Sequence, residues 1–159
     1  MIGVRLLSFN IAVLFLLATS AFGGDALPQS IGSLSLEQLQ SGEEARQEID
    51  RLHGKQITFR RGYIGTYGNG RAKLWVSEYD SEGEAAEGIG KMAQRMQTRK
   101  EGNFWHFREI SVQGVAVYFV VGKGQAHYFF QKGRKVIWLA VDPSLAREAI
   151  RDAIGKVLK

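Results

Sequence analysis

Apolar positions recur at helical spacing in three stretches of this chain, and each stretch opens on a residue that can cap a helix. The stretches are 41–54, 81–96 and 142–158. Ser41 and Ser81 are each followed three residues later by glutamate, the pattern of a capping box, and Asp142 precedes a proline suited to a first helical turn. The sequence therefore predicts three main helices.

Between these helices, apolar and polar positions alternate as in β-strands. A hairpin is predicted over 56–79 with its turn at 68–70, and four strands over 105–141 with turns at 113–114, 122–124 and 132–133. Residues 115–121 are apolar at nearly every position, which indicates a strand covered on both faces. We expect a single α+β domain with an antiparallel sheet of about six strands and helices mainly on one face.

Two segments follow the same order of features: a hairpin, a tryptophan on its second strand, a capped turn and a helix. Trp75 belongs to the first segment and Trp138 to the second. One explanation is a β-β-α unit used twice, and chance similarity is the other.

The start of the chain has the three-part pattern of a secretory signal peptide. Basic Arg5 precedes an apolar run over 6–17, and small residues follow it. The run is shorter than the roughly 20 residues that a membrane-spanning helix needs. We expect cleavage after Ala21, Gly23 or Ala26 and a periplasmic or secreted mature protein, which would contact a membrane only through the uncleaved leader.

The expected organisation has three parts. Residues 1–23 form the signal peptide, 24–40 an N-terminal segment and 41–159 the α+β domain. Within the N-terminal segment, Leu34 and Leu36 are expected to lie against the domain, together with Leu39.

Composition narrows the possible chemistry. The chain of 159 residues has no cysteine, which excludes disulfides, thiolate metal sites and a cysteine nucleophile. Its net charge of +5 is mild, and outside the cytoplasm nucleic acid is not an expected partner. His53, His106 and His127 lack metal-ligand spacing, so neither a metal ion nor a cofactor is expected. Glu78 and Asp80 could bind a cation, but Asp80 equally suits a turn.

The last hairpin places several rings together. If 132–133 forms a two-residue turn, Phe129 lies opposite Val136 and His127 lies opposite Trp138, all on one face. In the earlier hairpin, Trp75 and Tyr79 share the face directed away from the helices, and the similarity of the two segments places Trp138 there as well.

The predicted site is therefore an open sheet face that carries Trp75, Tyr79, His127, Phe129 and Trp138. Exposed apolar patches of this kind mark binding sites or subunit interfaces. Alternatively, the N-terminal segment or the first helix covers the face as ordinary core.

The runs Gly124–Phe130 (GQAHYFF) and Val136–Ala140 (VIWLA) resemble segments of small exported bacterial proteins of uncharacterised families. The resemblance extends over most of the mature chain, but its motifs are structural and imply no known activity.

The leading functional hypothesis is an exported, non-catalytic module that binds a small ligand or an envelope protein on the aromatic face. The alternative is a small hydrolase or other enzyme that uses His127 as a general base, which requires a second polar group beside it.

Overall fold

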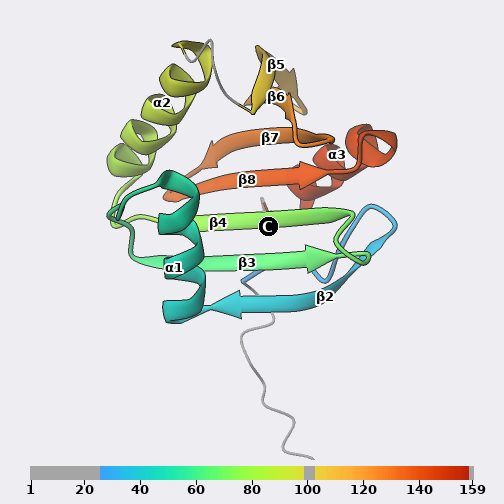
Figure 1. Cartoon of the computed structure of the whole chain (residues 1–159), viewed down its shortest axis with the longest axis horizontal. Coiled ribbons are helices and arrows are strands. Elements are labelled where there is room, and N and C mark those ends of the chain that lie inside the picture. The colour runs from blue at the N-terminus through green and yellow to red at the C-terminus, as the bar shows by residue number, and fades with distance from the viewer. Residues whose placement is uncertain (1–25, 99–102, 158–159) are drawn as a thin grey trace, which may run out of the picture.

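The computed structural model describes residues 26–98 and 103–157. Eight strands form one antiparallel sheet in the order β1-β2-β3-β4-β8-β7-β6-β5, and the sheet curls into a half-barrel (Figure 1). The strands are β1 (Ser30–Ile31), β2 (Leu34–Ser41), β3 (Arg61–Tyr67), β4 (Ala72–Glu78), β5 (Phe104–Val112), β6 (Val115–Gly122), β7 (Gln125–Lys132) and β8 (Lys135–Val141). The helices are α1 (Gly42–His53), α2 (Glu82–Thr98) and α3 (Ala146–Val157), with the 3-10 turn η1 (Pro143–Leu145) before α3.

The helices lie on both faces of this sheet. Helix α3 contributes its fully buried Ile154 to a cluster that includes Leu74 and Leu139 on one face, and it lies behind the sheet in Figure 1. On the other face, Ile49 of α1 and Ile89 of α2 belong to a second buried cluster. The expectation of helices mainly on one face is therefore wrong. The central strands are apolar on both faces, and each face has helical cover.

The expectation of about six strands is also wrong, because β1 and β2 lie within the segment that was expected only to pack against the domain. Leu34 is buried and Leu36 half-buried, whereas Leu39 is 38% exposed. A register shift between Leu36 and Gln38 interrupts the pairing of β2 with β3. The bulge breaks the simple alternation that would have predicted a strand.

The expected duplicated β-β-α unit is not reproduced. β4 and β8 are central neighbours, as two related hairpins could be. However, α2 follows β4 onto one face, and α3 follows β8 onto the other. Two copies of one unit, related by a twofold axis perpendicular to the sheet between β4 and β8, would have placed both helices on the same face.

Among the described residues, no helix combines the length and the apolar character needed to cross a membrane. The signal peptide expected over 1–23 lies outside the described residues.

Candidate functional site

The structure places all five predicted site residues on one face of the sheet. Trp75 of β4 is the direct antiparallel partner of Trp138 of β8, so both rings project to the same side. Phe129 of β7 is the partner of Trp138 on its other side, and His127 lies two residues before Phe129. Tyr79 follows β4 and belongs to the same buried cluster as Phe129.

The pairing within the last hairpin differs from the expected one. Lys132 pairs with Lys135, which makes 133–134 the two-residue turn. Consequently Phe129 faces Trp138 rather than Val136, and His127 faces Ala140 rather than Trp138. The β8 partner of each β7 residue is thus two positions further along the chain than expected. A shift by an even number of residues leaves every side chain on the face that was predicted for it.

The expected open face is wrong, because α1 and α2 cover much of it. Phe129 is fully buried and His127 is 4% exposed. Trp75 and Trp138 remain only partly buried. Between the helices and the sheet is a cavity of about 290 Å³, lined by Ile49, Leu52, His53, Trp75, Ser77, Tyr79, Met92, Arg95, Met96, Phe104, Lys123, Gln125, His127, Val136 and Trp138. Four of the five predicted residues line it, while Phe129 lies behind its wall.

His127 is held by hydrogen bonds at both ring nitrogens. The Trp138 indole N–H donates to His127 Nδ1 at 3.1 Å. An indole is only a donor, so the imidazole proton is on Nε2, which donates to the Gly122 carbonyl at 2.9 Å. Burial lowers the pKa of His127, nearby Lys123 lowers it further, and the Gly122 hydrogen bond opposes the shift. His127 is thus a neutral wall residue whose basic nitrogen is already occupied, which does not favour a general-base role.

A row of stacked rings supports this wall. Trp138 lies parallel to Phe129, with centroids 4.9 Å apart and planes within 6°. Phe129 stacks on Tyr118 at 5.2 Å, and Tyr118 stacks on Phe107 at 5.8 Å. The row crosses four adjacent strands, from β8 to β5. Phe104 adds edge contacts to His127 at 4.9 Å and to Trp138 at 5.7 Å.

Trp75 differs from Trp138 in its polar contacts. Its Nε1 is buried and has no hydrogen-bond partner among the described residues. The ammonium of Lys73 lies 5.1 Å from the Trp75 ring centroid and also pairs with Glu48 of α1. This ion pair connects α1 to the sheet beside the cavity.

The charged side chains of the lining are all basic. Arg95 of α2 and Lys123 of the β6–β7 turn are exposed. His53 is partly buried at the end of α1, with Nδ1 2.8 Å from the Ile49 carbonyl. None of the described residues that line the cavity is an aspartate or glutamate. The cavity therefore has an apolar, aromatic wall and a basic rim.

Two glycines, Gly88 and Gly122, bring the surrounding elements close together, and a third lies in a hairpin turn. A Cβ at Gly88 would lie 2.9 Å from the Tyr79 hydroxyl, so α2 approaches this ring closely. A Cβ at Gly122 would collide with the carbonyl of Asn103, immediately before β5. Lys123 and Gly124 have φ of 51° and 75°, which confirms the predicted hairpin turn; it comprises 123–124, because Gly122 ends β6.

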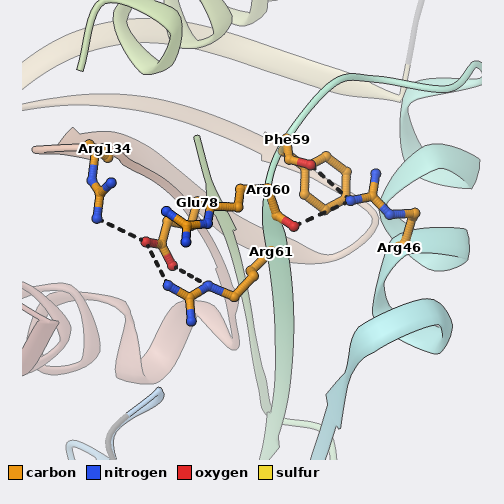
Figure 2. Close-up of polar contacts among 6 residues, drawn as sticks. All are labelled: Arg46, Phe59, Arg60, Arg61, Glu78 and Arg134. Carbon is orange, nitrogen blue, oxygen red and sulfur yellow. Dashed lines mark hydrogen bonds and ion pairs between the residues drawn. The ribbon is translucent and has the colours of Figure 1, made fainter. Parts of the chain in front are cut away.

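Glu78 is paired with two arginines. Its carboxylate accepts from Arg61, with Nε 3.1 Å from Oε2, and from Arg134 at 3.3 Å (Figure 2). Nearby, the guanidinium of Arg46 lies 4.2 Å from the Phe59 ring centroid and donates to the Phe59 carbonyl at 2.8 Å (Figure 2). Within 26–98 and 103–157 no group of three potential metal ligands is found. Two arginines on one carboxylate indicate a structural clamp between β3, β4 and the last hairpin.

Sequence reasoning missed much of the cavity. The helical spacing over 81–96 predicts a helix but does not indicate that Met92 and Met96 line a site. No local pattern indicated Arg95, Lys123 or Phe104, because these residues meet only through the packing of α2, the β6–β7 turn and β5.

Comparisons with protein-family models, with curated proteins and with solved structures found no match to this chain. The functional argument therefore rests on the geometry of its own residues.

Proposed function

We propose that this protein is an exported, non-catalytic module that binds a small, largely apolar ligand in the cavity between α1, α2 and the sheet. The observation that supports this most directly is a preformed hollow beside the stacked rings of Trp138 and Phe129. Its volume of about 290 Å³ is near the lower end of the range for small-molecule sites, roughly 300–1,000 Å³.

The polar network favours binding over catalysis. A binding wall needs side chains that keep their positions, and the Trp138–His127–Gly122 hydrogen bonds hold the ring of His127 in place. A hydrolase would instead need a nucleophile or water within hydrogen-bond reach of a free basic nitrogen. In addition, the flexible thioethers of Met92 and Met96 provide a wall that can adapt to different apolar shapes.

Titration with naphthalene and 1-octanol, followed by tryptophan fluorescence and backbone amide shifts, tests this function. We expect saturable shifts at Trp138 and at residues of α2 that line the cavity. Met96→Trp, which fills the cavity, should abolish binding, whereas Met96→Leu should retain it. Urea unfolding of both variants shows whether the fold is preserved. Absence of binding by these probes and by octanoate would overturn the proposal.

Export is part of the same proposal. Leu27 is buried, and the carbonyl of Pro28 accepts from the Tyr67 hydroxyl at 2.9 Å, so the packed domain includes residue 27. Cleavage after Ala21, Gly23 or Ala26 would leave these contacts intact. Intact-mass measurement of the extracytoplasmic fraction should give a chain beginning between Phe22 and Leu27, and a mass that retains Met1–Ala21 would contradict export by cleavage.

A further inference from the structure

We infer that the ligand is an acidic amphiphile: a small apolar chain or ring that carries one carboxylate. This inference rests on the proposed ligand-binding function and adds the charge of the ligand. Its basis is the separation of two kinds of surface within one cavity, with aromatic and aliphatic walls inside and basic side chains at the rim.

The two rim cations come from elements that are distant in sequence. Arg95 is in the last turns of α2, and Lys123 is at the tip of the β6–β7 hairpin. Both are exposed, and neither forms an ion pair within 26–98 and 103–157. Elsewhere in this part of the chain, basic side chains such as Arg61, Lys73 and Lys91 do pair with carboxylates. Within this part of the chain, the positive rim is therefore available to a ligand.

The composition of the lining argues against a cationic ligand. No described lining residue carries a negative charge, so a ligand ammonium would meet only like charges. An adjoining hollow does contain Glu84 and Glu87, but Glu87 pairs with Lys91 of the same helix. Arg95 lines both hollows, whereas Glu84 and Glu87 do not line the aromatic cavity.

The expected contribution of the rim is modest because both cations are solvated. Ion pairs at exposed positions strengthen an interaction by up to about fivefold each, so the two together should contribute about threefold to tenfold. Burial of the ligand's apolar part supplies the remaining binding free energy, and the basic rim sets the preference for an acidic head group.

The test compares octanoate, 1-octanol and octylammonium, which share one chain and differ in head-group charge. Affinities are measured by tryptophan fluorescence and calorimetry below the micelle concentrations. We expect octanoate to bind about threefold to tenfold more tightly than 1-octanol, and octylammonium to bind most weakly. The octanoate advantage should disappear in about 1 M salt, where charges are screened beyond roughly 3 Å.

Arg95→Gln/Lys123→Gln should lower octanoate affinity by about threefold to tenfold and 1-octanol affinity by less, so that the two ligands bind about equally. The matched control is Arg147→Gln/Arg151→Gln on α3, which removes the same charge from exposed positions on the opposite face. That control should retain the preference for octanoate.

Two failures are distinguishable. If 1-octanol binds at least as tightly as octanoate, or if both double variants lose the preference equally, the acidic head group is wrong and the apolar site remains. If no probe binds, the ligand-binding function itself is wrong.

Discussion

Trp75 and Trp138 face each other as direct partners on β4 and β8, yet only the indole N–H of Trp138 has a hydrogen-bond acceptor among the described residues. The two rings thus lie on the same sheet face and line the same cavity, but only one of the two indole N–H groups is hydrogen-bonded. A buried donor without a partner costs free energy, whereas a satisfied one connects its ring to a neighbour. The pair therefore offers a matched comparison within one site.

Replacing each tryptophan with phenylalanine should give unequal losses of stability. Trp138→Phe leaves Nδ1 of buried His127 without its donor, an added cost of about 1–3 kcal/mol. Trp75→Phe removes an N–H that has no partner, so it should cost less than Trp138→Phe by about that amount. Urea unfolding of both variants measures the difference, and equal losses would show that the His127 hydrogen bond contributes nothing.

Stability should fall on mild acidification because of His127. Burial lowers the folded-state pKa of this residue below its ordinary value of 6.5, at which the unfolded chain takes up its proton. Below pH 6.5 the unfolded state therefore binds more protons, and the unfolding free energy decreases until the pH passes the folded-state pKa. Above pH 6.5 this contribution is constant. His127→Phe should flatten the dependence, as measured by urea unfolding at successive pH values from neutral to mildly acidic.

Two glycines of α2 should respond differently to alanine. Gly90 is exposed and nothing lies within 4 Å of an added Cβ, so Gly90→Ala should stabilise the protein by about 0.5–1 kcal/mol. At Gly88 the new methyl group would lie 2.9 Å from the Tyr79 hydroxyl. Gly88→Ala brings the same gain in helix propensity, but the displacement of Tyr79 should offset it. Thermal unfolding distinguishes them, and equal stabilisation would show that α2 does not press on Tyr79.

The last helix should be essential for the fold. Ile154 is fully buried against the sheet, and truncating such a side chain costs about 2–5 kcal/mol. Ile154→Ala should therefore lower the urea midpoint substantially. Arg151→Ala, on the exposed side of the same helix, should change the unfolding free energy by less than about 0.5 kcal/mol. An unchanged midpoint for Ile154→Ala would mean that this side of α3 does not face a core.

Local patterns in the sequence determined the three helices, the strands over 104–141, the hairpin turn at 68–70 and the set of side chains that share a face. The strand expected from residue 56 is wrong at its start, because β3 begins at Arg61. Helical spacing and two-residue alternation depend on neighbouring residues alone, so they can be recognised without a fold. That Trp75 and Trp138 lie on the same face is one of the features that local patterns predict. This prediction holds although the register predicted for the last hairpin is wrong, because a shift by two residues leaves side chains on the same face.

The tertiary structure decided which face each helix covers, the joining of β1 and β2 to the sheet, and the cavity. Both faces of β7 and β8 are apolar, so their composition cannot show that α2 packs on one and α3 on the other. The rim cations Arg95 and Lys123 meet only after α2 and the β6–β7 turn have packed around the sheet. Such contacts join residues far apart in the chain, and no local periodicity encodes them.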